Sequence, residues 1–296
     1  MRETKIIMGM PVTVEIVGRG TAGTPAAGAM PNETDLAAIF DYFTAIDERF
    51  STYKPASEIS RINRGEIDER DWSDDMRIIF MLAEETKQRT GGFFDIKKPG
   101  GGAGASPGAT AGSNRRDFYD PSGIVKGWAI FQSAKLIESR GFANFYVDAG
   151  GDIQTGGVNL DASGGRSEKK PWSVGIKNPL KNPSAGQPDE VVKIIYAAGD
   201  AEKSGLGIAT SGTYIRGEHI YNPKTGVPPD ETNGKILSLT VIGPNVYEAD
   251  RFATAAFAMG RDGIQFIESL PGFEGYMIDA DGIATMTTGF EKYIKE

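Results

Sequence analysis

The sequence predicts an α+β fold, a single compact unit in which mixed, mainly antiparallel sheets are flanked by helices. Strand-like segments follow one another in runs, and helical segments separate these runs at irregular intervals, whereas a parallel βαβ array would alternate the two regularly. No internal repeat and no change in composition divides the 296 residues into two parts. We therefore expect one domain over residues 1–296.

The expected strands are short segments in which apolar and polar residues alternate, or brief apolar runs bounded by turn residues. The first contains Val12, Val14 and Ile16, and another, at residues 145–148, ends in the glycine pair of AGGD. Further strands are expected at residues 172–177, 191–197, 236–242, 275–279 and 283–288.

Helices are expected where apolar residues recur at every third or fourth position. Ser73 is the expected N-cap of one helix, and Gly141 is the expected left-handed residue that ends another. The first expected helix runs from a polar start around residues 32–34 to Phe50, and the others cover residues 74–83, 125–140, 246–259 and 263–269.

One stretch is too rich in glycine and alanine to belong to either kind of element. It reads PGGGAGASPGATAGS at residues 99–113. Such low-complexity composition is typical of flexible chain. We expect a mobile insertion at residues 99–114.

Composition excludes several classes of function. The net charge of −8 and the pI near 5.0 argue against nucleic acid as a partner, because a negative field repels phosphate backbones. The absence of cysteine removes disulfides, thiolate nucleophiles, Fe–S clusters and thiolate zinc sites. No segment approaches roughly 18 consecutive apolar residues, so no transmembrane segment is expected.

The N-terminal residues lack the apolar stretch and the cleavage site of a secretion signal. We expect a cytoplasmic protein if the chain is complete, and an exported lipoprotein if an N-terminal signal was trimmed.

A glycine motif near the N-terminus resembles a dinucleotide-binding fingerprint. GRGTAG at residues 18–23 matches G-x-G-x-x-G and follows a strand. That fingerprint requires a helix to open inside it, so that free N–H groups meet a pyrophosphate. Pro25, Gly28 and Pro31 interrupt any such helix, and a solvent-exposed loop is the better interpretation.

Two glycine-containing turns could hold an anionic ligand. DPSGIVKG at residues 120–127 precedes an expected helix, whose free N–H groups and nearby lysine could bind an anion or could simply form a turn. The glycine pair of AGGD at residues 149–152 indicates either a close approach of a ligand or a plain turn.

The only histidine, His219, lies between the hydroxyl-rich turn ATSGT at residues 209–213 and the turn NPKTG at residues 222–226. A lone histidine is often structural, but imidazole is suited to taking a proton from a hydroxyl.

Asp250 and Thr254 are four residues apart in an expected helix and therefore share a face. A carboxylate beside a hydroxyl provides the hard oxygen ligands that Mg²⁺ prefers, although an acidic residue near a helix start also complements the helix dipole.

Taken in order, these segments resemble the ApbE-type FAD:protein FMN transferase family of flavin transferases. The matching segments are MGMPV (8–12), FSTYKPASEISRIN (50–63), GFFD (92–95), GIVKG (123–127), AGGD (149–152), ATSG (209–212), HIYNPKTG (219–226) and ADRFAT (249–254). The chain departs from the family at DIKKPGG (95–101) and DPSG (120–123), where the family reads DPTVGPL and DLGG.

The resemblance implies a T-fold-related unit that moves FMN from FAD onto a Thr or Ser hydroxyl of an acceptor flavoprotein, with Mg²⁺ as cofactor and AMP as product. It implies that Asp250, Thr254 and the main-chain carbonyl of Val125 bind Mg²⁺, and that His219 is the catalytic base. The implied FAD contacts are Met8, Tyr53, Phe93, Phe94, Asp95, Gly123, Lys126, Thr210, Ser211 and Ile220.

Two other hypotheses stay open. In the first, the chain is a Mg²⁺-dependent FAD pyrophosphatase, in which water takes the place of the acceptor hydroxyl and FAD yields FMN and AMP. In the second, it is a non-catalytic protein that binds or stores FAD, and His219 only stacks or donates a hydrogen bond. The sequence predicts neither the acceptor nor the oligomeric state.

Overall fold

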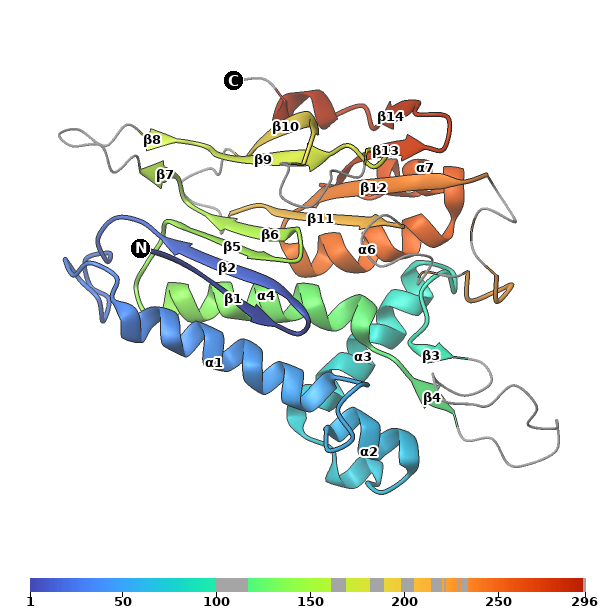
Figure 1. The fold of residues 1–296 in the computed structure, drawn as a ribbon, viewed down its shortest axis with the longest axis horizontal. Helices are drawn as coiled ribbons and strands as arrows, with labels where there is room; N and C mark the ends of the chain where they lie inside the picture. The colour runs from blue at the N-terminus through green and yellow to red at the C-terminus, as the bar shows by residue number, and fades with distance from the viewer. Residues whose placement is uncertain are drawn as a thin grey trace.

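An antiparallel sheet of eight strands organises the computed structural model, in the order β1-β2-β5-β6-β11-β12-β13-β14 (Figure 1). Its strands are β1 (Arg2–Ile7), β2 (Met10–Ile16), β5 (Phe145–Ala149), β6 (Asp152–Gly156), β11 (Gly207–Gly212), β12 (Ile236–Gly243), β13 (Glu274–Asp279) and β14 (Ala284–Met286). Every neighbouring pair in this sheet is antiparallel. The predicted α+β class is confirmed.

The structure describes residues 1–98, 117–160, 169–181, 189–197, 205–213, 220, 222–227, 229 and 234–294. The predicted insertion at residues 99–114 and the predicted base His219 lie outside the described residues. Within these ranges, no helix has both the length and the apolar character needed to cross a bilayer.

Helices cover one face of the sheet, with α4 (Ser122–Ser139) and α6 (Val246–Ala258) against it and α1 (Glu33–Phe50) outside α4 (Figure 1). Among the described residues, the other helices are α2 (Glu58–Arg64), α3 (Asp74–Arg89) and α7 (Gly263–Glu268), with short 3₁₀ turns at Glu69–Asp71, Gly260–Asp262 and Phe290–Tyr293. Ser73 caps α3 as predicted, since its side chain accepts from the N–H of Met76. Helix α4 begins at Ser122, earlier than predicted, and Gly141 follows it with φ +100°.

The hairpin of β9 (Trp172–Lys177) and β10 (Val191–Ala197) covers the other face of the sheet (Figure 1). Its inward side chains, including Val174 and Ile195, pack with Ile208 and Ile242 of the central strands. Two further pairs are very short, namely β3 (Lys97–Lys98) with β4 (Phe118–Tyr119) and β7 (Asn159–Leu160) with β8 (Lys169–Lys170).

The hydroxyl-rich segment at residues 209–213 was predicted as a turn, and that prediction is wrong, because most of it belongs to strand β11. Thr210 pairs with Thr240 of β12, and their hydroxyl oxygens lie 2.9 Å apart. The strand begins at Gly207, where an added Cβ would lie 1.9 Å from the carbonyl carbon of Asn245. This close approach places the start of α6 directly against β11.

Candidate active site

A cavity of about 620 Å³ lies where seven parts of the chain converge. Its walls come from the start of β2, the loop after α3, the first turn of α4 and the turn between β5 and β6. Strands β9 and β11 and helix α6 complete the lining. The volume falls in the range of about 300–1,000 Å³ that is usual for small-molecule and cofactor sites.

Most of the predicted site residues meet in this cavity. Those that line it are Phe93, Phe94, Asp95, Gly123, Lys126, Thr210, Ser211, Ile220, Asp250 and Thr254. They come from five separate segments of the sequence, so the fold assembles them.

Three predicted residues do not line the cavity. The side chain of Tyr53, in the turn after α1, is 91% exposed. Met8 stands in the β1–β2 turn with φ +55°, next to Gly9, which does line the cavity. Val125 is buried in α4, in the same turn as Gly123 and Lys126, which do line the cavity. His219 cannot be placed, although Ile220 follows it in sequence and contributes to the wall.

Asp250 lies at the floor of the cavity, buried between α6 and α4. The N–H of Gly127 donates to its Oδ2 at 2.8 Å, and the Nζ of Lys126 lies 3.7 Å from its Oδ1. Burial, and to a lesser extent the nearby carboxylate of Asp152, raise the pKa of Asp250 to about 7, although Lys126 and the Gly127 N–H act in the opposite direction. The positive charge beside the buried Asp250 carboxylate therefore does not fully offset the cost of its burial.

Lys126 joins this carboxylate to Asp152, a residue absent from the predicted site. The Lys126 ammonium forms an ion pair with Asp152, whose other oxygen accepts from the N–H of Thr210 at 3.0 Å. Asp152 is almost fully buried. One ammonium between two buried carboxylates leaves a local excess of negative charge, which favours a cation beside them. The signal in the sequence was the acidic residue that ends AGGD.

Gly127 is the reason α4 and α6 approach closely enough to form this arrangement. A Cβ at this position would lie 2.6 Å from the Cβ of Asp250 and 2.9 Å from the carbonyl oxygen of Val246. Contacts this short cannot persist, so any larger residue must separate the two helices.

We expect Gly127→Ala to lower both stability and metal affinity. The helices must move apart by several tenths of an ångström, which costs about 1–3 kcal/mol of unfolding free energy and weakens the Gly127–Asp250 hydrogen bond. Chemical denaturation and Mg²⁺ titration of the same samples measure the two effects. Ser133→Ala, on the buried face of α4 away from the cavity, is the control. An alanine variant with wild-type stability and Mg²⁺ affinity would contradict the close packing.

The first turn of α4 lines the cavity with Ser122 and Gly123. The N–H of Ser122 is bonded to Asp120 and that of Ile124 to the carbonyl of Pro121, which leaves the N–H of Gly123 for a ligand. A Cβ on Gly123 would lie 3.2 Å from the Phe94 ring and 3.3 Å from Thr254 Cγ2, so glycine keeps this turn close to both residues. Asp120 accepts from the N–H of Ser122 at 3.1 Å and pairs with Lys98 Nζ at 2.5 Å. Although burial opposes it, these contacts hold the pKa of Asp120 below its usual value. The start of α4 at Gly123 is therefore a suitable binding site for an anion, which we call the anion seat.

Aromatic and aliphatic groups form one end of the cavity. Phe94 is buried, Phe93 is half-buried, and Pro223 and Ile220 lie in the same wall. The Nζ of Lys224 lies 4.0 Å from the centre of the Phe93 ring, which fastens the 222–227 turn to the loop after α3.

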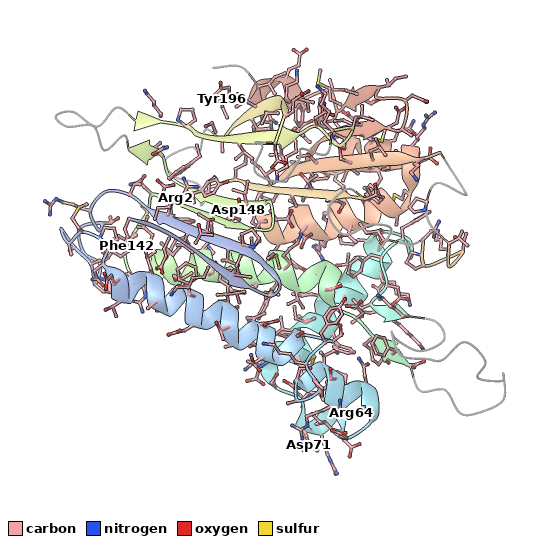
Figure 2. The ribbon with its side chains drawn as sticks, in the orientation of Figure 1. Arg2, Arg64, Asp71, Phe142, Asp148 and Tyr196 are labelled. Atoms are coloured by element: carbon pink, nitrogen blue, oxygen red, sulfur yellow. The ribbon has the colours of Figure 1, made fainter. Side chains whose placement is uncertain are left out.

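Polar residues that the sequence did not predict also line the cavity. Tyr146 and Asp148 face it from β5, and Figure 2 shows Asp148 among the central strands. Burial raises the pKa of Asp148, while the N–H of Gly151, which donates to Oδ1 at 2.8 Å, lowers it. Nothing in the local sequence marks Asp148, because it becomes part of the site only when β9 covers β5.

The donors on the cavity floor fit a hard cation that keeps part of its water shell. No group of three or more His, Cys, Asp or Glu side chains able to hold a metal occurs within the described ranges. Asp250 and Thr254 nevertheless both line the cavity and lie one helical turn apart. Mg²⁺ characteristically takes one or two carboxylates and fills its remaining positions with water and phosphate oxygens. This donor set suits Mg²⁺ and does not suit a dedicated all-protein metal cage.

Comparison with known proteins gives a consistent result. The profile described as "ApbE family" matches residues 8–98 and 114–277. The FAD:protein FMN transferase of Klebsiella pneumoniae is 32% identical over 173 residues, which cover 56% of this chain and 43% of that protein. The protein of the same name from Escherichia coli K12 is 30% identical with the same coverage. The aligned region thus spans less than half the length of these relatives.

Solved structures share the whole fold. The flavin transferase ApbE from Vibrio cholerae matches with a TM-score of 0.74 and 22% identity, over 99% of this chain and 98% of that one. The ApbE protein of Thermotoga maritima matches with a TM-score of 0.76 and 21% identity, over 100% and 99% of the two chains.

Proposed function

Because the chain belongs to the ApbE family, we propose that it is a Mg²⁺-dependent FAD:protein FMN transferase. It moves FMN from FAD onto a Thr or Ser hydroxyl of an acceptor flavoprotein and releases AMP. Its relatives from Klebsiella pneumoniae and Escherichia coli carry the name of this activity.

One observation carries the proposal, namely the cavity floor on which Lys126 lies between Asp152 and Asp250. A phosphoryl-transfer site must neutralise the oxygens of a pyrophosphate while holding its two ends in place. The floor combines an ammonium and carboxylates that attract a divalent cation, and Gly123 at the start of α4 lines the same cavity. The aromatic end at Phe93 and Phe94 offers an apolar surface to a ring system.

Asp250, Thr254 and the main-chain carbonyl of Val125 would hold Mg²⁺, which when bound supplies positive charge to the pyrophosphate oxygens. Lys126 and the N–H of Gly123 in the first turn of α4 bind the remaining phosphate charge. Asp95, Thr210, Ser211 and Ile220, which line the cavity, are assigned to the rest of the FAD contacts.

In the transfer step, the acceptor hydroxyl oxygen attacks the phosphorus on the flavin side of the pyrophosphate. A new P–O bond joins FMN to the acceptor, the P–O bond to AMP breaks, and AMP leaves with the bridging oxygen. His219 takes the proton of the attacking hydroxyl. Atoms and charge balance without any oxidant or reductant.

Mass spectrometry of a candidate acceptor tests the proposal directly. The chain is incubated with FAD, Mg²⁺ and the acceptor, and the acceptor should gain the mass of one FMN less water while an equal amount of AMP appears. Release of AMP at the same rate without any acceptor would identify a pyrophosphatase. FAD binding with neither product would identify a storage protein.

We expect His219→Ala to slow FMN transfer by roughly 10²–10⁴-fold while FAD binding changes little, since a general base acts only on the attacking hydroxyl. Initial rates of AMP release with saturating acceptor measure the first effect, and flavin fluorescence titration measures the second. His219→Gln, which keeps hydrogen-bonding capacity but cannot take the proton, should be equally slow. Undiminished transfer in either variant would remove histidine from the mechanism.

A further inference from the structure

The segment at residues 50–63, FSTYKPASEISRIN, contributes no residue to the cavity lining. It forms a small helical lobe with α3, and Figure 2 shows Arg64 and Asp71 in this lobe, far from Asp148. Its hydrogen bonds are mostly internal. Ser57 caps α2 and donates to the carbonyl of Ser51 at 2.7 Å, and Glu58 accepts from the N–H and the hydroxyl of Ser73 at 2.6 and 2.7 Å.

Asn63 is different, because its carboxamide reaches out of the lobe. Its Nδ2 donates to the carbonyl oxygen of Tyr119 at 2.9 Å, and its Oδ1 accepts from the N–H of Tyr119 at 2.8 Å. The two groups are 56 residues apart in sequence. A carboxamide that satisfies both the donor and the acceptor of one residue replaces a neighbouring strand along β4.

The lobe also holds the ring of Tyr119. Phe80 of α3 meets it with ring centres 5.0 Å apart, and Trp72 meets Phe80 with ring centres 4.4 Å apart. Tyr119 is therefore fixed at its backbone by α2 and at its side chain by α3.

Tyr119 is directly connected to the cavity. The next residue, Asp120, lines the cavity, donates its N–H to the carbonyl of Ile96 at 2.8 Å and accepts from the N–H of Ser122. Helix α4 begins at Ser122 and carries Gly123 and Lys126. A displacement of Tyr119 must therefore move Asp120 and the anion seat at the start of α4.

We propose that Asn63 is a positioning residue that fixes the junction between β4 and α4 and thereby sets the affinity of the cavity for the pyrophosphate of FAD. The inference rests on the proposed function for its ligand, but the contact between Asn63 and Tyr119 does not.

The first test needs no ligand. Hydrogen–deuterium exchange of the free protein should show faster exchange across residues 118–126 in Asn63→Ala, while exchange in β11 and β12 stays at the wild-type rate. Arg64→Ala is the matched control, since the Arg64 side chain lies on the same helix and bonds Glu66 and the carbonyl of Pro55. Unchanged exchange across residues 118–126 in Asn63→Ala would overturn the proposal, whatever the ligand proves to be.

The second test measures FAD binding and turnover. Asn63→Ala should weaken FAD binding and raise the KM for FAD roughly tenfold, because two hydrogen bonds are lost, while kcat at saturating FAD falls less than twofold. Asn63→Asp has the same shape but directs a carboxylate oxygen at the carbonyl of Tyr119, so it should be at least as damaging.

Ile59→Val separates positioning from general destabilisation of the lobe. Ile59 is fully buried in α2, and its apolar side chain cannot form a hydrogen bond with Tyr119. It should lower the Tm without changing the KM for FAD. An Ile59→Val variant that raises KM as much as Asn63→Ala, or an Asn63→Asp variant with wild-type KM, would overturn the proposal. If the wild type itself binds no FAD, the proposed function fails while the exchange result still decides the role of Asn63.

Discussion

Asp250→Asn is expected to reduce FMN transfer by roughly 10²–10³-fold while leaving the protein as stable as the wild type, or more stable, in the absence of Mg²⁺. Charge neutralisation by a metal is worth several kcal/mol in a transition state, and each 1.36 kcal/mol is a factor of about ten in rate. Stability should not fall, because burial disfavours the Asp250 carboxylate, and asparagine removes that charge while its Oδ1 can still accept from the N–H of Gly127.

Initial rates of AMP release measure the fall in FMN transfer, and thermal unfolding with and without Mg²⁺ measures the stability. A ligand that binds only the folded state raises the Tm, so Mg²⁺ should stabilise the wild type and should have no effect on Asp250→Asn. Thr254→Val removes the second oxygen and should weaken Mg²⁺ binding while keeping the shape of the side chain. Equal stabilisation by Mg²⁺ of the wild type and Asp250→Asn would show that the ion binds elsewhere.

The helices of this fold were predictable where the chain itself contains their signals. Ser73 and Gly141 mark a start and an end that hold in the structure. Helix α2 was missed because it is seven residues long, and helices this short depend on tertiary contacts such as those of Ser57 and Asn63. No local pattern carries that information.

The central strands were harder to predict for a physical reason. Each of the five residues of β6 is buried, because helices cover one face and the β9–β10 hairpin covers the other, so the apolar–polar alternation that marks a strand disappears. Strand β11 contains small and hydroxyl residues that favour turns, and only its pairing with β12 makes it a strand.

The candidate site shows the same limit. Spacing along one helix was enough to bring Asp250 and Thr254 together, and both line the cavity. Asp152 was not predicted as a site residue, because its role depends on the ion pair with Lys126. The two residues are 26 positions apart in sequence, and only the packing of α4 on the sheet brings them together. Asp148 was not predicted for a similar reason. Local patterns predict which side chains could act, and the fold decides which of them meet.

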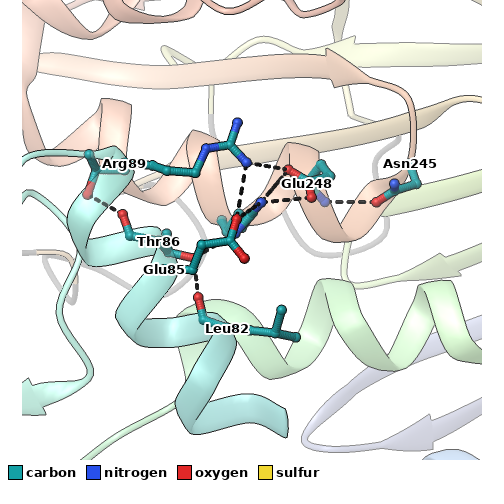
Figure 3. A network of polar contacts seen from close by, with 8 residues as sticks. Leu82, Glu85, Thr86, Arg89, Asn245 and Glu248 are labelled. Carbon is teal, nitrogen blue, oxygen red and sulfur yellow. Dashed lines mark hydrogen bonds and ion pairs between the residues drawn. The ribbon is translucent and has the colours of Figure 1, made fainter.

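Arg251→Met is expected to lower the free energy of unfolding by about 3 kcal/mol, the low end of the cost of removing one partner from a buried ion pair. Arg251 is 1% exposed on α6 and forms two hydrogen bonds of 2.7 and 2.8 Å from its Nη2 to Glu248. It also joins α6 to α3, through Thr86 Oγ1 at 3.1 Å and Glu85 Oε1 at 3.2 Å. Figure 3 shows Glu85, Thr86 and Arg89 of α3 facing Glu248 of α6.

The loss of unfolding free energy in Arg251→Met should stay near the low end of that range, because the acidic partners of Arg251 keep contact with water. The side chains of Glu85 and Glu248 are 47% and 20% exposed, so neither is left as a fully buried charge when the guanidinium is lost. Arg251→Lys should lose nearly as much stability as methionine, since a single ammonium cannot reproduce the planar fork that reaches both helices.

Arg89→Met provides the matched control, because Arg89 binds the same two carboxylates at 3.3 and 3.7 Å from a side chain that is 42% exposed. Its loss should cost less than about 1 kcal/mol, as for other exposed pairs. Urea denaturation of the four proteins ranks them directly. If Arg251→Met and Arg89→Met lose equal stability, the fork of Arg251 is not what joins α3 to α6. Since α6 carries Asp250, a loosened α6 should also weaken Mg²⁺ binding in Arg251→Met and leave it unchanged in Arg89→Met.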